Sequence, residues 1–170
     1  MLVTVRAETG EDLPAIGKVH DQAFGQKNEG LLVEKLRANP DFVPQLSLVA
    51  ELDGRVLGHV LFFPVRIGGK ECKALALAPV GVLPEFQKKG IGGGMIRQGL
   101  ARARELGYRS VNVLGDNDYY PRFGFQPSTE WKVTSAFDCQ PEHFMALELV
   151  SGGLEDVEGC VEYPEEFNDV

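Results

Sequence analysis

The sequence has few cysteines and no long apolar run, and both shortages limit what the chain can be. Its three cysteines, Cys72, Cys139 and Cys160, are odd in number and lack CxxC spacing, which argues against a disulfide framework and against a zinc site. No stretch reaches the roughly 18 apolar residues of a membrane span, and the N-terminus lacks the basic patch and apolar run of a secretion signal. We therefore expect a protein of the reducing cytoplasm, with no membrane contact and no metal.

Length and charge predict one folded domain with an acidic end. The 170 residues suffice for one domain with a buried core, and 44% hydrophobic with 25% charged residues is ordinary globular composition. The net charge of -8 is concentrated at residues 138–170, which hold ten acidic residues and no Lys or Arg, whereas residues 1–137 hold 17 basic and 15 acidic residues. We expect one domain over 1–150 and an acidic extension over 151–170, packed on that domain or trailing from it. The negative charge disfavours nucleic acid as a partner.

Hydrophobic periodicity predicts a strand followed by two helices and a meander. A strand over 3–6 precedes Thr9 and Asp12, which form a capping-box pattern before helical spacing over 13–24 and again over 31–36. Asp-Gly at 53–54 and Gly-Gly at 68–69 are turn signals, so three antiparallel strands are expected over 46–52, 56–67 and 72–83.

The second half of the chain predicts a βαβ unit and hence a mixed sheet. Helical spacing over 91–106 ends at Gly107, a suitable C-cap, and a β-branched run follows over 110–114. A strand, a helix and a strand in this order place the two strands in parallel. Further strands are expected over 125–133 and 144–150.

A glycine-rich segment over 84–94 lies between the predicted strand and helix. Backbone N–H groups and the dipole at a helix N-terminus favour an anion, and Lys88 and Lys89 add positive charge. The segment is not a Walker A loop, since it lacks Gly-Lys-Ser/Thr, and not GxGxxG, because Met95 stands where the third glycine would be. Two interpretations stay open at this point: an anion-binding loop, or a tight strand-to-helix turn.

Two short motifs carry a family resemblance. Residues 87–92, Gln-Lys-Lys-Gly-Ile-Gly, fit the pattern Q/R-x-x-G-x-G/A, and residues 120–125, Tyr-Pro-Arg-Phe-Gly-Phe, fit Tyr-x-x-x-Gly-Phe. In these motifs and their order the sequence resembles the GNAT superfamily of N-acetyltransferases, by element order over about 3–150 and by motif over 80–125. The resemblance implies a single-domain α/β fold: a mixed, mostly antiparallel sheet with a central splayed parallel strand pair, flanked by helices. It also implies direct transfer of an acetyl group from acetyl-CoA to a primary amine in a ternary complex.

The resemblance assigns a set of residues to coenzyme A. The strand before the loop would be bulged and splayed, so that its backbone pairs with pantetheine, and the loop would hold the pyrophosphate. Gly81 suits such a bulge, or it relieves crowding against a neighbouring strand. Asn117 would be a further contact, although residues 114–120 leave little room for the Asn and short helix that many relatives have there. The cofactor-binding residues are thus expected to be Val80, Gly81, Val82, Gln87, Lys88, Lys89, Gly90, Ile91, Gly92, Gly93 and Asn117.

Catalytic residues also follow from the resemblance. Tyr120 matches the tyrosine that often protonates the departing thiolate, a role suited to a phenol of pKa about 10; Tyr119 replaces it if the register slips by one, and packing alone is the alternative role. The strand glutamate that some relatives use as a base has no counterpart over 72–83. Asp116 is the candidate base, or a turn-forming residue. Glu29 is a second candidate, or an ordinary first-turn acid.

Several alternatives remain open from the sequence. His20, His59 and His143 lack metal-ligand spacing. We predict that His59 is a hydrogen-bonded histidine within the sheet; the alternative is that it faces the cleft between the splayed strands. The rival functions are a CoA-binding sensor or scaffold without turnover, and a nucleotide-binding α/β protein unrelated to CoA. The expected partner is a small-molecule amine or a peptide or protein amine, and the protein is a monomer or a homodimer.

Overall fold

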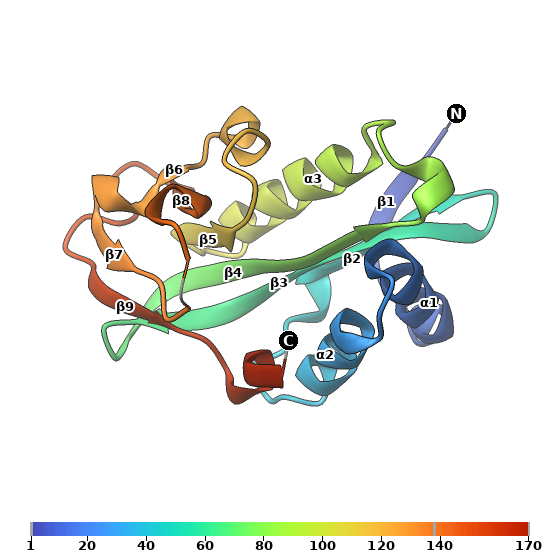
Figure 1. The fold of residues 1–170 in the computed structure, drawn as a ribbon, viewed down its shortest axis with the longest axis horizontal. Helices are drawn as coiled ribbons and strands as arrows, with labels where there is room; N and C mark the ends of the chain where they lie inside the picture. Colours follow the sequence, from blue (N-terminus) through green and yellow to red (C-terminus); the bar gives the residue numbers. More distant parts are fainter. Residues whose placement is uncertain (1, 138, 170) are drawn as a thin grey trace. The chain divides into compact units, whose positions relative to one another are not determined.

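The computed structural model describes residues 2–137 and 139–169 (Figure 1). The strands are β1 (Thr4–Ala7), β2 (Ser47–Leu52), β3 (Arg55–Ile67), β4 (Lys70–Val82), β5 (Ser110–Leu114), β6 (Gln126–Pro127), β7 (Lys132–Thr134), β8 (Phe144–Glu148) and β9 (Glu158–Glu162). The α-helices are α1 (Leu13–Phe24), α2 (Asn28–Arg37) and α3 (Ile91–Glu105).

The strands form an open, mixed and mostly antiparallel sheet in the order β1-β2-β3-β4-β5-β8-β6. β1 to β3 pair antiparallel in sequence, and so do β5 with β8 and β8 with β6. The pairing of β4 with β5 is parallel, from Ala74 opposite Ser110 to Ala76 opposite Asn112, and β4 continues past this register to Val82. The predicted α/β fold class with its mixed sheet is therefore confirmed.

Backbone contacts divide the chain into two compact units. The first comprises the chain up to Phe63, the segment Ala78–Arg102 and the residues from Glu165 on. In this unit α1 and α2 lie on one face of the strands and α3 begins on the other (Figure 1). Glycines permit the close approach: a β-carbon placed on Gly58 would meet Met95 of α3, and one placed on Gly81 would meet His20 of α1.

The second unit comprises Pro64–Leu77 and Ala103–Pro164. The expected strand over 125–133 is wrong: β6 ends at Pro127, a 3-10 turn occupies Ser128–Glu130, and β7 follows. The physical reason is the proline, which donates no N–H to a ladder. The acidic end contributes β9, which pairs with Arg66 and Ile67 of β3, and the buried core of this unit includes Phe144 and Val161.

No helix among residues 2–137 and 139–169 has both the length and the hydropathy needed to cross a membrane.

Candidate functional site

The loop that joins β4 to α3 folds back on the end of its own strand. The side chain of Gln87 donates a hydrogen bond of 2.9 Å to the backbone oxygen of Val82. Lys88 and Gly90 then adopt left-handed backbone angles, with φ of 63° and 84°, a conformation that glycine reaches at little cost. The N–H of Gly94 bonds to the oxygen of Gly90, which starts α3. Two exposed lysines, Lys88 and Lys89, therefore come shortly before the first N–H groups of the helix in the chain. Such a segment is a suitable place for an anion.

The loop is anchored where it leaves the sheet. The N–H of Leu83 bonds to the oxygen of Leu57 at 2.9 Å, and a 3-10 turn follows over Pro84–Phe86. Arg55 pairs with Glu85 at 3.2 Å and lies over the ring of Phe86, 5.3 Å from its centre. The backbone of the strand thus fixes the start of the loop, while the ion pair is exposed and contributes little stability.

The strand segment ahead of the loop contains Val80, Gly81 and Val82 at the end of β4. Gly81 is required by close packing, because a β-carbon there would lie 2.6 Å from Nδ1 of His20. Of the two roles predicted for this glycine, relief of crowding is the one that these contacts support. The crowding comes from helix α1 and not from a neighbouring strand.

Asp116 organises the turn after β5. Its backbone oxygen accepts hydrogen bonds from the N–H groups of Tyr119 and Tyr120, and its Oδ1 accepts one of 2.8 Å from the N–H of Asp118. These bonds are those of a turn-forming aspartate, the alternative interpretation of this residue. Asn117 is exposed in the same turn.

Tyr120 is half-buried among aromatic rings that follow the turn. Its ring lies 5.1 Å from that of Tyr119 and 5.8 Å from that of the buried Phe125. Burial raises the pKa of Tyr120 to about 12, and the proximity of Tyr119 and Asp116 acts in the same direction. The phenol is consequently protonated throughout the neutral pH range. Arg122 lies over the ring of Tyr119 at 4.5 Å.

Glu29 lies in the first turn of α2 and has a local partner. Both of its carboxylate oxygens accept from Nε2 of Gln26, at 3.0 and 3.1 Å. This arrangement is that of a first-turn acid at a helix N-terminus.

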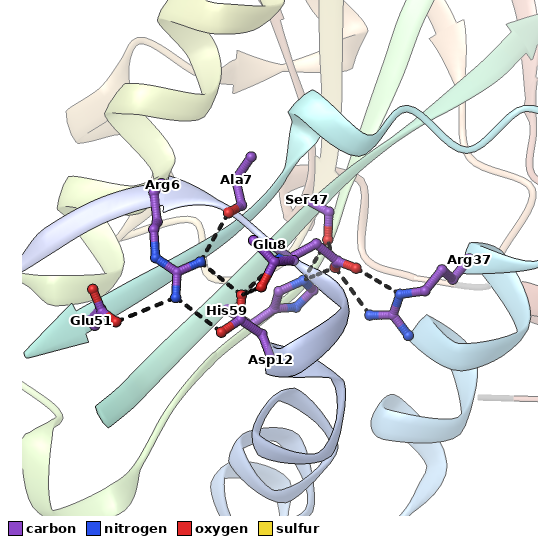
Figure 2. A network of polar contacts seen from close by, with 9 residues as sticks. Arg6, Ala7, Glu8, Asp12, Arg37, Ser47, Glu51 and His59 are labelled. Atoms are coloured by element: carbon purple, nitrogen blue, oxygen red, sulfur yellow. Dashed lines mark hydrogen bonds and ion pairs between the residues drawn. The ribbon is translucent and has the colours of Figure 1, made fainter. Parts of the chain in front are cut away.

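A buried polar network that no local sequence pattern indicates joins Glu8 to Arg37 of α2, Ser47 of β2 and His59 of β3 (Figure 2). It continues to His20 of α1. Arg37 donates two hydrogen bonds to Glu8, at 2.7 and 3.0 Å, and the Ser47 hydroxyl donates a third. Ser47 also contacts Nε2 of His59 at 2.8 Å, and Nδ1 of His59 lies 2.8 Å from Nε2 of His20. The prediction of a hydrogen-bonded sheet histidine at position 59 is therefore confirmed.

The network fixes the charges of its members. Burial acts to raise the pKa of Glu8, but His59, whose Nε2 lies 3.5 Å from Oε1 of Glu8, and hydrogen bonds from Arg37 and Ser47 lower it to about 2. Burial lowers the pKa of His20 to about 3, with smaller contributions from His59 and Arg37, and burial likewise lowers the pKa of His59. At neutral pH the carboxylate is ionised and both imidazoles are neutral.

A second cluster beside it stabilises the start of α1. Arg6 donates to both oxygens of Asp12, at 2.7 and 2.9 Å, and reaches Glu51 at 3.4 Å (Figure 2). Oδ2 of Asp12 accepts from the N–H of Thr9 at 2.7 Å, so the predicted capping box is present. The bond from Arg6 is the main reason that the pKa of Asp12 falls to about 2.

Two polar side chains of β5 are buried without protein partners. Among the described residues, the amide oxygen and nitrogen of Asn112 and the hydroxyl of Ser110 accept or donate no hydrogen bond. The residues opposite Asn112 in the ladder are Ala76 and Ala146, neither of which has a side chain that could hydrogen-bond to the amide.

Other candidate binding features are few in the described part of the chain. A pocket of about 490 Å³ is lined by α1, by the turn between β2 and β3 and by Leu83, and none of the predicted site residues lines it. No group of three His, Cys, Asp or Glu side chains among the described residues is placed to hold a metal ion.

The fold and the loop together define a class of protein: an α/β chain with an open mixed sheet and a glycine-rich, lysine-bearing loop between a strand and a helix. A model of the GNAT acetyltransferase domain matches residues 4–128, so the chain belongs to the GNAT family of acetyltransferases. The predicted resemblance is confirmed, and with it the enzyme class.

Relatives from bacteria support this assignment. The chain is 33% identical over 165 residues to the uncharacterized N-acetyltransferase YhbS of Escherichia coli. The matched region covers 96% of this chain and 98% of YhbS. It is 41% identical over 118 residues to the uncharacterized N-acetyltransferase YjhQ of E. coli, covering 68% of this chain and 65% of YjhQ.

Two solved structures have the same fold. The complex of E. coli YhbS with CoA matches with a TM-score of 0.93 at 32% identity, over 98% of this chain and 92% of that one. The complex of a GNAT family acetyltransferase from Brucella melitensis with acetyl-CoA matches with a TM-score of 0.81 at 38% identity, over 98% of both chains.

Proposed function

We propose that this protein transfers an acetyl group from acetyl-CoA to a primary amine, by direct attack of the amine on the thioester in a ternary complex. The observation that carries the proposal is the loop over 87–93, whose glycines and lysines stand in front of the N-terminus of α3. Family membership and the CoA and acetyl-CoA complexes of two relatives support the same donor. The cytoplasm is the proposed location, because none of the three cysteines is paired.

The loop would hold the pyrophosphate of CoA. Backbone N–H groups at the helix start and the charges of the two lysines would both stabilise the anion. Backbone of the β4 segment that precedes the loop would pair with pantetheine. The residues proposed for CoA binding are Val80, Gly81, Val82, Gln87, Lys88, Lys89, Gly90, Ile91, Gly92 and Gly93, with Asn117 as an additional contact.

Tyr120 is proposed as the general acid. When the amine expels the thiolate of CoA, the phenol would give its proton to the sulfur and regain one from solvent. Its raised pKa supports the role in one respect, since the proton is present at neutral pH.

A base must take up the proton that the acceptor amine loses. An alkyl ammonium has a pKa of about 10.4 and no lone pair until it is deprotonated. Asp116 is the proposed base and Glu29 the alternative, and each already accepts hydrogen bonds from its own loop or helix. Asn substituted for Asp116 and Gln substituted for Glu29 would distinguish them by which change lowers turnover at saturating acetyl-CoA.

The CoA site can be tested by two substitutions in the loop. Gly90→Asp and Gly92→Asp would place a negative charge where the pyrophosphate is proposed to lie, so CoA affinity measured by calorimetry should fall at least about tenfold. Gly10→Asp is the matched control, because Gly10 is exposed with open space around it. Unchanged CoA affinity in the two folded loop variants would remove the loop from the proposal.

Turnover needs its own experiment. A thiol-release assay with acetyl-CoA and pooled small amines, amino acids and peptides should reveal an acceptor. If CoA binds but no amine in the pool releases thiol, the chain is a CoA-binding sensor or scaffold, an alternative that the missing strand glutamate favours.

A further inference from the structure

Two neighbouring glycines in the sheet of the first compact unit allow helices to approach the strands closely. Gly81 of β4 and Gly58 of β3 lie side by side, since a β-carbon on Gly58 would come within 3.2 Å of the Gly81 oxygen. From one face His20 of α1 approaches Gly81, and from the other Met95 of α3 approaches Gly58. The strand segment that leads into the glycine-rich loop is therefore held between two helices.

The side chains that the two helices place against the strands, Met95 and His20, differ in conformational freedom. Met95 has three rotatable bonds and can move the end of its side chain to suit its surroundings. His20 has no such freedom: it is fully buried, its Nε2 is hydrogen-bonded to His59 at 2.8 Å, and its ring stacks on Phe24 with centres 6.0 Å apart.

The hydrogen-bond directions in the network fix the proton on each imidazole. The Glu8 carboxylate can only accept hydrogen bonds, so the Ser47 hydroxyl donates its one hydrogen to it. Ser47 Oγ must then accept a hydrogen bond from Nε2–H of His59. Neutral His59 then carries a lone pair on Nδ1, which accepts from Nε2–H of His20. The remaining nitrogen, Nδ1 of His20, therefore carries a lone pair.

Among residues 2–137 and 139–169 that lone pair meets no hydrogen-bond partner, and it faces the strand. Nδ1 of His20 is buried, and it is the atom nearest to the position of a Gly81 β-carbon, at 2.6 Å. The ring therefore rests its unprotonated edge against the backbone of β4, where a ring with a proton at this nitrogen would need more room. Burial lowers the pKa of His20 to about 3, so the ring is neutral at physiological pH and carries one proton only.

We propose that His20 is a positioning residue for acetyl-CoA: held by His59, Ser47 and Glu8, its imidazole supports β4 at Gly81 and sets the path of the backbone that binds pantetheine. This inference rests on the proposed CoA site. It assigns to the buried network a role in cofactor affinity, carried through the strand and not through any contact of His20 with the ligand.

The test is a double-mutant cycle with CoA binding as its readout. Gly81→Ala adds a methyl group 2.6 Å from a ring that is fully buried and hydrogen-bonded to His59, so we expect the strand to shift. A coupling between two sites commonly changes an affinity about 5- to 150-fold, so CoA affinity by calorimetry should fall at least about tenfold. His20→Ala removes the obstacle, so adding Gly81→Ala to that variant should cost less than about threefold. Gly17→Ala is the control, because it adds a methyl group to the same helix in open space and should leave affinity unchanged.

A second variant covers the case in which Gly81→Ala does not fold. His20→Gln keeps an N–H for Nδ1 of His59 and removes the rigid ring edge from Gly81. In this folded variant the KM for acetyl-CoA should rise about five- to tenfold while the KM for the amine stays the same; a merely structural role would lower the melting temperature and leave both KM values unchanged.

The outcomes separate the two proposals. Wild-type CoA affinity in folded Gly81→Ala, or an equal loss with and without His20, would overturn the role of His20 and leave the CoA site standing. Failure of the wild-type protein to bind CoA at all would overturn the proposed function and this inference with it.

Discussion

Buried polar side chains in this protein divide into those with partners and those without. Glu8, Ser47 and His59 satisfy one another, whereas Ser110 and Asn112 have no hydrogen-bond partner within the described residues. An unsatisfied buried group costs about 1–3 kcal/mol, so each of these two side chains is expected to lower the free energy of unfolding by about that amount.

At the same scale, the hydroxyl of Tyr120 can be tested apart from its ring. Tyr120→Phe keeps the aromatic contacts with Tyr119 and Phe125 and removes the proton donor. Acetyl-CoA binding should survive, and kcat with an identified acceptor should fall about 10²–10⁴-fold, the usual contribution of a general acid.

The control for this prediction is the neighbouring tyrosine. Tyr119→Phe should retain near wild-type kcat, because the family motif places the acid at position 120. If both single variants and the double variant keep wild-type turnover, neither tyrosine is the acid and solvent protonates the thiolate.

At the scale of single elements, local patterns predicted the structure wherever the deciding signal was local. The turns Asp53-Gly54 and Gly68-Gly69 and the helix α3 follow from glycines and from apolar spacing. The strand expected over 125–133 failed because Pro127 and the following turn outweigh its apolar residues. β9 was missed because its pairing with Arg66 and Ile67 connects segments far apart in the sequence.

Helix α1 carries a glycine that its packing does not need. A β-carbon on Gly17 would meet no atom within 4 Å, and a glycine inside a helix costs about 0.5–1 kcal/mol relative to alanine. Gly17→Ala should therefore increase the free energy of unfolding by about that amount, measured by urea denaturation. A loss of stability would mean that α1 and α2 require closer contact at this position than their separation indicates.

At the scale of the whole molecule, the neutral imidazoles make stability depend on pH. The pKa of His20 falls from 6.5 to about 3 on folding, so the unfolded chain binds more protons between these values and stability is lost as pH falls below 6.5. From pH 6.5 to 5 this amounts to about 2 kcal/mol for His20 alone. Glu8, with a folded pKa of about 2, adds a further loss below pH 4.5.

Denaturation at pH 7 and pH 5 checks this prediction. His20→Gln should lose less stability between the two pH values than the wild type does, because it removes the imidazole whose pKa falls on folding. Equal pH dependence in wild type and His20→Gln would contradict the proton assignment.

Sequence and structure contributed differently to the candidate site. The loop over 87–93 and the tyrosine motif were found from sequence because each is contiguous and carries its own spacing. The network around Glu8 was not, because its members come from separate elements and only the fold brings them together. Gly81 was also singled out from the sequence, but its neighbour His20 lies some sixty positions away in the chain, so no local pattern reports their contact.

The network between Glu8 and His20 also has a polarity, because every proton in it points toward the carboxylate. The Glu8 carboxylate at one end of the network therefore determines which nitrogen of the His20 imidazole, at the other end, carries no proton. An amide in place of that carboxylate could donate as well as accept, and each hydrogen bond would then be free to reverse. Glu8 thus determines, through Ser47 and His59, the protonation of the imidazole edge that lies against β4 at Gly81.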